Sequence, residues 1–227
     1  MTQVAKTHRL DDRLVPSDSH EYVATAEMTW DEWLGWEYEH GLTEWVDGVA
    51  YVYMSNSALH QRIVTFLVTL LNIFSERAGS GVVQCAPYAL KARGGRGGRS
   101  GREPDVMYIS NAKVVSQQER FMAGPPDIVV EVVSDDSVRR DQNVKLLEYQ
   151  ELGASEYWLV DSRPGEQSAD FFVLDAHGRY QPAPVEDGVF RSTVLDGFWL
   201  KIDWLFEERP KALAAFRAIT AGTDSGA

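Results

Sequence analysis

Hydrophobic residues recur at helical spacing across residues 57–79, SALHQRIVTFLVTLLNIFSERAG. Apolar side chains three and four positions apart fall on one face of an α-helix. Here they are Leu59, Ile63, Phe66, Leu67, Leu70, Leu71 and Phe74. Gly79 stands where a helix commonly ends, because glycine adopts the left-handed conformation that closes the last turn. The pattern predicts a long core helix.

Two shorter apolar runs read as buried strands: IVVEVV at residues 128–133 and EYWLVD at residues 156–161. The stretch between them, SVRRDQNVKLLEYQELG, predicts a helix with Ser137 as its cap and Gly153 as its end. A strand–helix–strand crossover makes the two strands parallel. These segments therefore predict the centre of an α/β sheet.

The other patterned segments predict antiparallel additions. In TWDEWLGWEYEHG, Thr29 and Glu32 have capping-box spacing, and the predicted helix runs to Gly41. TEWVDGVAYVYM predicts a hairpin turning at Asp47-Gly48. GVVQCAPYAL and PDVMYIS read as strands, and a last helix is expected from about Asp203 to Ala218.

We therefore expect an α/β fold in which helices flank a mixed β-sheet with hairpin additions. A chain of 227 residues, 44% of them hydrophobic, can bury one sizeable core. The expected organisation is a polar, poorly ordered segment over residues 1–25, one domain over 26–218 and a flexible tail over 219–227.

Composition narrows the class of protein. The single cysteine, Cys85, cannot form an internal disulfide, which fits a reducing compartment. The first twenty residues have no apolar core typical of a secretory signal, and no apolar run reaches the ~20 residues of a membrane span. We expect a cytoplasmic protein without a membrane segment. The formal net charge of −12 argues against a generic nucleic-acid coat protein.

One segment runs against the acidic balance. KARGGRGGRSGR, residues 91–102, contains five basic residues and no acid: Lys91, Arg93, Arg96, Arg99 and Arg102. It reads as a glycine-rich loop. Two interpretations stay open, a solvated hairpin tip and an arm whose arginines contact phosphates.

Glu131 lies at the centre of the apolar run 128–133. Burying a carboxylate is costly unless a cation, hydrogen-bond donors or a raised pKa compensates for it. Asp105 begins the strand PDVMYIS, and sequential strands often lie side by side. The two acids could then share a divalent cation, and a hard oxygen site with few protein ligands suits Mg²⁺.

Lys145 is expected to point toward the same place. On the helix after Glu131, Lys145 falls on a largely apolar stripe with Val138, Tyr149 and Leu152, and this stripe faces the sheet. The alternative is a surface ion pair between Lys145 and Asp141, four residues earlier.

These residues resemble a known group of enzymes. Pro104-Asp105 followed after twenty-five residues by Glu131 is similar to the PD-(D/E)XK nuclease superfamily. A more extensive likeness is to the Uma2 family of restriction-endonuclease-like proteins. It is carried by LTEWVDGVAYVYMSNSALHQRIV, REPDVMYIS, PDIVVEVVSDDSVRRDQNVKLLEYQELGASEYWLV and LDGFWLKIDWLF. The likeness covers roughly residues 27–207.

The resemblance implies a restriction-endonuclease-like sheet and a metal-dependent endonuclease that hydrolyses DNA. Asp105 and Glu131 match the metal-binding acids for Mg²⁺ or Mn²⁺, with the Val132 carbonyl as a further ligand. The superfamily's lysine position is Val133 here, so Lys145 from the next helix takes that role. Glu44 matches an acid on the first hairpin that faces the same site.

Other features carry weaker implications. His60 and Gln61 match a pair that recurs in the family and either contact the substrate or serve as ordinary helix-start residues. Cys85 reads as a buried structural cysteine, and the tryptophans at 30, 33 and 36 read as core or subunit contacts. Many nucleases pair to cut both strands, which leaves a homodimer open. The rival interpretation is a non-catalytic nuclease-like module that binds nucleic acid or a partner protein.

Overall fold

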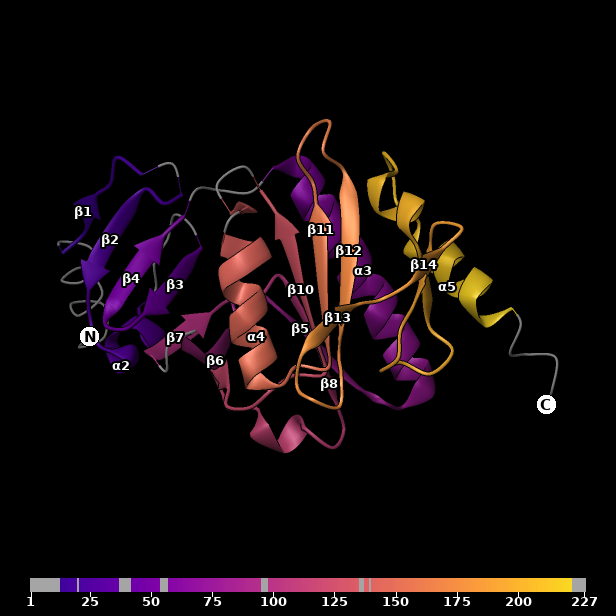
Figure 1. The fold of residues 1–227 in the computed structure, drawn as a ribbon, viewed down its shortest axis with the longest axis horizontal. Helices are drawn as coiled ribbons and strands as arrows, with labels where there is room; N and C mark the ends of the chain where they lie inside the picture. Colours follow the sequence, from indigo (N-terminus) through magenta and orange to yellow (C-terminus); the bar gives the residue numbers. More distant parts are fainter. Residues whose placement is uncertain are drawn as a thin grey trace, which may run out of the picture.

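A computed structural model gives the structure of the protein. It describes residues 13–19, 21–36, 42–53, 57–94, 98–134, 137–138 and 140–221. Within these ranges the chain forms three β-sheets and several helices (Figure 1). This mixed α/β architecture is the one that the sequence predicts.

The central sheet has six strands in the order β13-β12-β11-β10-β8-β5. β10 and β11 are parallel, with Glu131 opposite Leu159, and every residue of both strands is buried. β8 and β12 flank this pair in antiparallel orientation. The strands are β13 (Tyr180–Pro182), β12 (Ser168–Leu174), β11 (Glu156–Asp161), β10 (Ile128–Val133), β8 (Val106–Ser110) and β5 (Gly81–Cys85).

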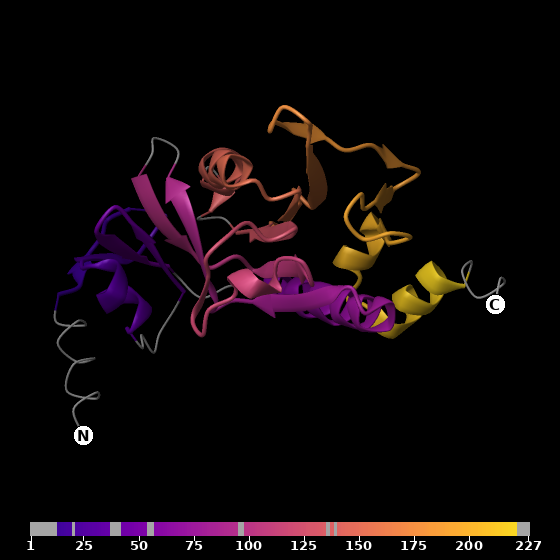
Figure 2. The same ribbon diagram turned by 90° about the horizontal axis from the view of Figure 1, so that it is seen from below.

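Helices cover both faces of the central sheet. Figure 2 shows α3 (Ala58–Ala78) and α4 (Leu146–Leu152) on opposite sides of it. On the α3 side, Val130 and Val132 pack with the helix's apolar stripe and with α5 (Ala212–Thr220). On the α4 side, Val129 and Val133 pack with Tyr149. Alternate residues of β10 therefore belong to different cores, as expected for a strand.

The second sheet has seven strands in the order β1-β2-β4-β3-β7-β6-β9 and lies beside the central sheet (Figure 1). The predicted hairpin turn is confirmed: Asp47 and Gly48 both have positive φ, 47° and 97°. The strands are β1 (Val15–Pro16), β2 (Ala24–Glu27), β3 (Thr43–Val46), β4 (Val49–Val52), β6 (Ala89–Gly94), β7 (Gly98–Arg102) and β9 (Phe121–Met122).

The short helix α2 (Trp30–Leu34) packs on this second sheet. The predicted capping box is present, because the Thr29 hydroxyl accepts from the Glu32 amide and the Glu32 carboxylate accepts from the Thr29 amide. The tryptophans form core contacts, as predicted: Trp33, Trp36 and Trp45 are buried together. The small third sheet joins β14 (Val185–Glu186), β15 (Val189–Arg191) and β16 (Trp199–Lys201).

Several local expectations need correction. The helix after Thr29 ends at Gly35, and the predicted end at Gly41 lies outside the described residues. Residues expected in the poorly ordered lead-in form β1 and begin β2. The predicted last helix is a 3₁₀ segment, Ile202–Phe206, followed by α5. Cys85 is exposed on the edge strand β5 rather than buried. A further 3₁₀ turn spans Val114–Ser116.

The helix expected over residues 137–153 begins in an unexpected form. A π-helical turn, Arg140–Lys145, precedes α4. The Ser137 carbonyl accepts the Asp141 amide at 2.9 Å and its hydroxyl accepts from the Ser134 amide at 3.0 Å, while the predicted side-chain cap involves residue 139, which lies outside the described residues. The predicted end at Gly153 is confirmed, with φ of 91°.

The length and composition of α3 are those of a membrane-crossing helix. Its apolar stripe, however, packs inside the protein, where Ile63, Leu67, Leu70 and Leu71 are fully buried.

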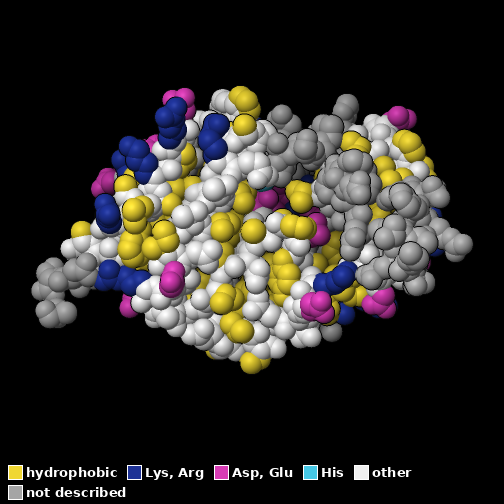
Figure 3. Space-filling model, turned by 180° about the vertical axis from the view of Figure 1, so that it is seen from behind, with side chains coloured by type: hydrophobic (Ala, Val, Ile, Leu, Met, Phe, Trp, Pro, Cys, Tyr) yellow, Lys and Arg dark blue, Asp and Glu magenta, His cyan; other side chains and the backbone are white. Residues whose placement is uncertain are grey.

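Figure 3 shows the rear face of the molecule, where Lys and Arg side chains gather toward the end on which α5 lies. This face shows no continuous basic stripe among the residues described.

Gly101 on β7 permits the tryptophan packing. A Cβ atom there would lie 2.5 Å from ring carbons of Trp30 and Trp33. We expect Gly101→Ala to lower the free energy of unfolding by roughly 1–3 kcal/mol, as overpacking typically does. Gly124→Ala is the control, because its Cβ would lie 3.3 Å from the Ser116 hydroxyl. Urea unfolding of both variants measures the difference, and equal stabilities would contradict this account of Gly101.

Candidate active site

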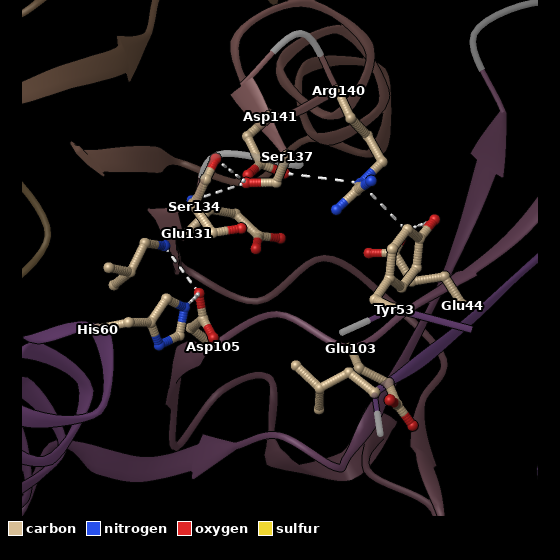
Figure 4. Close-up of a pocket in the computed structure, with 12 residues that line it drawn as sticks. Glu44, Tyr53, His60, Glu103, Asp105, Glu131, Ser134, Ser137, Arg140 and Asp141 are labelled. Atoms are coloured by element: carbon tan, nitrogen blue, oxygen red, sulfur yellow. Dashed lines mark hydrogen bonds and ion pairs between the residues drawn. The ribbon is translucent and has the colours of Figure 1, made fainter. Parts of the chain in front are cut away.

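A small cavity of about 50 Å³ lies where the two larger sheets meet near the end of β10 (Figure 4). At least one probe sphere, roughly 10–15 Å³, is needed to hold a water, so the cavity has room for a few atoms. Its lining is mostly polar: Leu42, Glu44, Tyr53, His60, Glu103, Asp105, Glu131, Val132, Ser134, Ser137, Arg140 and Asp141.

Pro104 and Asp105 end the pairing of β8 with β10. The last pair in register is Val130 with Val106. Proline has no N–H to continue a ladder. The Asp105 carboxylate accepts the Val132 amide instead, at 2.7 Å. Glu131 continues the alternation of Val129, which faces the α4 side. Asp105 lies just outside β8, and both acids line the same cavity.

Glu131 is 3% exposed and held by two groups from the following helix. The Tyr149 hydroxyl donates to Oε1 at 2.6 Å, and Lys145 Nζ lies 3.0 Å from Oε2. Burial raises the pKa of Glu131 to about 8. The charge of Lys145 opposes this rise, whereas Asp141, Asp105 and Glu44 reinforce it. Burial therefore favours the protonated form of Glu131, whereas the Lys145 ammonium and the Tyr149 hydroxyl favour the ionised one.

Lys145 points inward, as its position on the apolar stripe predicts. Its Nζ lies 2.8 Å from Glu44, 3.0 Å from Glu131 and 3.1 Å from Asp141. Burial opposes the charge of the ammonium, but the three carboxylates hold the pKa of Lys145 well above its usual value. The alternative pairing with Asp141 is thus present too, but it is buried and not at the surface.

Glu44 on β3 is an ionised counter-charge. Burial alone would raise its pKa, yet Lys145, Arg102 and Arg140 hold it well below the usual range. Arg102 Nη1 donates to Oε2 at 2.7 Å, and the Tyr53 hydroxyl donates to the same oxygen at 3.1 Å. Both Glu44 oxygens therefore have cationic partners.

The structure corrects the prediction for Arg102. This residue is 3% exposed, and its guanidinium donates to both Glu148 oxygens, through Nε and Nη2 at 2.7 Å. It is an internal link between β7 and α4 and not a mobile phosphate contact. Arg99 is exposed on β7. The Arg93 side chain and Arg96 lie outside what the structure describes.

His60 and Gln61, at the start of α3, are placed differently. His60 is 2% exposed, lines the cavity, and has Nε2 3.3 Å from Asp105 Oδ2. Gln61 is exposed and is not among the cavity-lining residues. His60 is therefore a buried neighbour of Asp105 at the cavity. A substrate contact by Gln61 stays a prediction.

The sequence did not indicate seven of the lining residues, of which four are titratable: Tyr53, Glu103, Arg140 and Asp141. Burial raises the pKa of Glu103 to about 7. The amide of Thr43 opposes the rise, and the charge of Glu44 adds to it. Glu103 directly precedes the Pro104-Asp105 pair, and Asp141 stands four residues before Lys145, so spacing could have indicated both. Nothing in the local pattern singles out Tyr53 or Arg140.

The residues present fit a hard divalent cation. Asp105 and Glu131 both offer carboxylate oxygens to one cavity. In the described part of the chain, Asp105 Oδ1 has no hydrogen-bond partner. Among these residues no three His, Cys, Asp or Glu side chains group to hold a metal. A site with few protein ligands suits Mg²⁺, which keeps several waters. Whether the two acids share one cation stays a prediction.

The balance of charges around the cavity also favours the binding of a cation. Three cations face six carboxyl groups in and around the cavity among the described residues. The cations are Arg102, Arg140 and Lys145, and the acids are Glu44, Glu103, Asp105, Glu131, Asp141 and Glu148. A bound proton or a bound cation reduces this negative excess.

The raised pKa of Glu131 predicts how stability depends on pH. The pKa of Glu131 is higher in the folded than in the unfolded protein. Its favourable contribution to the free energy of unfolding is therefore fully present below about pH 4.5 and is lost as pH rises through about 8. Gln keeps the shape and cannot ionise. Without metal, Glu131→Gln should therefore gain stability relative to wild type between pH 5 and 9, by up to roughly 4 kcal/mol.

Urea unfolding of both chains in EDTA across this pH range measures the effect. Lys145 keeps Glu44 and Asp141 in the variant, so we expect little loss at pH 5. A stability difference that stays constant with pH would contradict the raised pKa.

Comparisons with known proteins assign the chain to a family. A family model described as Uma2, putative restriction endonuclease, matches residues 30–203. A search of curated proteins finds no match. A crystal structure described as a putative nuclease belonging to DUF820, from Anabaena variabilis, is similar over 79% of this chain and 97% of its own, with a TM-score of 0.62 and 17% identity. At that identity the likeness shows the fold alone, and this is the restriction-endonuclease-like fold expected from the sequence. Because the family model covers most of the chain, the protein belongs to the Uma2 family.

Proposed function

We propose that the protein is a metal-dependent endonuclease that hydrolyses DNA phosphodiester bonds. The observation that supports this most is the proximity of three side chains. Asp105 and Glu131 line one cavity, and Lys145 Nζ lies 3.0 Å from Glu131 Oε2. Two acids and a lysine are the groups that the nuclease resemblance requires.

In this proposal Asp105 and Glu131 hold Mg²⁺ or Mn²⁺, and the Val132 carbonyl is a further ligand. When bound, the cation polarises the phosphate, lowers the pKa of water and offsets negative charge. The Val132 amide donates to Asp105 Oδ2, and His60 Nε2 lies 3.3 Å from the same oxygen, so both groups position this carboxylate. The Tyr149 hydroxyl fixes Glu131 in the same way.

Lys145 is proposed to orient the attacking water or to stabilise charge that develops on the phosphate. Its pKa is held well above its usual value, so it acts as a cation and not as a base. Glu44 and Asp141 set its position through contacts of 2.8 and 3.1 Å. Glu44 thus acts through Lys145, as a positioning residue.

Double-stranded DNA is the proposed partner, and a homodimer would allow cleavage of both strands. The exposed Arg99, with Arg93 and Arg96, is proposed to contact phosphates outside the cavity. Arg102 is left out of this group because it is buried and bonded to Glu148.

One observation favours a second candidate, a non-catalytic nuclease-like module. Lys145 is 3% exposed and in contact with three carboxylates, as a purely structural cation would be. Such a module would keep its fold and lack cleavage.

Cleavage of mixed DNA substrates with Mg²⁺ or Mn²⁺ decides between the candidates. We expect the wild type to cut, and Asp105→Asn, Glu131→Gln and Lys145→Met each to lose at least about a hundredfold in rate. Asp203→Asn is the matched acid control, since Asp203 is an exposed carboxylate paired only with Lys201 among the described residues. No cleavage by wild type on any substrate, or equal rates for Glu131→Gln, would rule out the enzyme proposal.

Metal affinity should rise with pH because the cation must displace the proton of Glu131. With the pKa of Glu131 at about 8, Mn²⁺ binding should strengthen roughly tenfold per pH unit between pH 6 and 7.5 and level off above 8. Isothermal titration in buffers of different ionisation enthalpy measures both the affinity and the released proton. A pH-independent affinity would show that Glu131 is not the ligand.

A further inference from the structure

Arg140 lines the cavity but takes no part in the roles assigned above. It is the first residue of the π-helical turn, and its side chain is 13% exposed. Its guanidinium carbon lies 4.1 Å from the centre of the Tyr53 ring. Figure 4 shows the guanidinium directed toward the cavity, between Asp141 and Tyr53. The ring holds the cation in place and leaves its N–H groups unused.

The hydrogen-bonding capacity of Arg140 is not met inside the protein. Nε and Nη1 are both buried and have no hydrogen-bond partner among the described residues. The nearest acids are too distant for a good bond: Nε lies 3.5 Å from Glu44 Oε2 and 4.0 Å from Asp141 Oδ1. An unsatisfied buried donor on a charged group is costly, so a ligand that accepts here would be stabilised.

Arg102 provides the contrast within the same cluster. All three of its guanidinium nitrogens donate at 2.7 Å, to Glu44 and Glu148. The same kind of side chain is therefore saturated at one position and unsatisfied at the other, where it borders the cavity. An arginine that served only as a structural counter-ion would be expected to use all of its donors within the protein, as Arg102 does.

We infer that Arg140 binds an oxygen of the substrate's phosphodiester in the cavity, an inference that rests on the proposed nuclease function. A guanidinium only donates hydrogen bonds, so its ligand must be an acceptor, and its planar donors fit phosphate oxygens. The surrounding acids repel a phosphate on their own. Arg140 is the one cavity-lining cation of the described residues that has unused donors.

The inference is tested by DNA binding in the Glu131→Gln background, which keeps the shape of the side chain and is expected to prevent cleavage. A labelled mixed-sequence duplex is titrated by fluorescence anisotropy in EDTA at several salt concentrations. We compare Arg140→Gln and Arg140→Lys, with Arg191→Gln as the surface control, because Arg191 is exposed on β15. Thermal melts verify folding. If the background chain does not fold, the series is run on the wild type in EDTA.

Arg140→Gln should weaken binding about tenfold or more and lower the slope of log K against log salt by roughly one unit. Arg140→Lys should keep the salt slope and bind DNA more tightly than Arg140→Gln, because lysine keeps the positive charge. It should still bind more weakly than the parent, because lysine lacks the planar pair of guanidinium donors. Arg191→Gln should match its parent. In the otherwise wild-type enzyme, Arg140→Gln should raise KM more than it lowers kcat.

The inference is overturned if Arg140→Gln keeps the parent's affinity and slope, if Arg191→Gln weakens binding equally, or if the parent does not bind DNA. Cleavage by the wild type separates these results from the function itself. Unchanged binding beside active cleavage overturns the role of Arg140 alone. If Arg140→Gln loses DNA binding but the wild type does not cleave DNA, the proposed phosphate contact is supported and the proposed nuclease activity is ruled out.

Discussion

The buried ammonium of Lys145 is the interaction on which the site depends. Its three carboxylate partners come from different parts of the fold: Glu44 from the second sheet, Glu131 from the central sheet, and Asp141 from the π-helical turn. Desolvating these charges is costly, and removing one partner of a buried pair typically costs roughly 3–5 kcal/mol. The ammonium therefore fixes how the two sheets and the helix meet.

Arg102 extends this constraint. It joins Glu44 on β3 to Glu148 on α4, so the second sheet is tied to the same helix at a second point. The carboxylate of Glu44 is shared by Lys145 and Arg102, one on each oxygen. A displacement of β3 would leave two buried cations short of counter-charge. The geometry of the cavity is thus maintained by charge pairing as well as by the apolar cores on either side.

The sequence predicted the parts of the site that follow a regular period. The β10 run, the crossover helix and the inward stripe of Lys145 needed only local spacing, and the hairpin at Asp47-Gly48 needed only turn chemistry. Arg102 was misjudged because glycine and arginine suggested a solvated loop. In fact Gly101 is required by the tryptophan rings, and the strand's alternation turns Arg102 inward. Such contacts come from distant segments, so no local pattern could reveal them.

The excess of carboxylates links stability to the proposed chemistry. With three cations for six acids in and around the cavity, the protein alone leaves an excess of negative charge, and the raised pKa of Glu131 favours a proton there that reduces it. A divalent cation would relieve the same excess without the proton. If so, the apo and metal-bound states differ in the protonation of one carboxyl, while Lys145 keeps its partners in both. On this account the structural cluster does not compete with the metal site: it holds Glu131 where exchanging a proton for a cation costs little rearrangement. A structural role for Lys145 and a catalytic one are therefore compatible, and cleavage, not burial, distinguishes them.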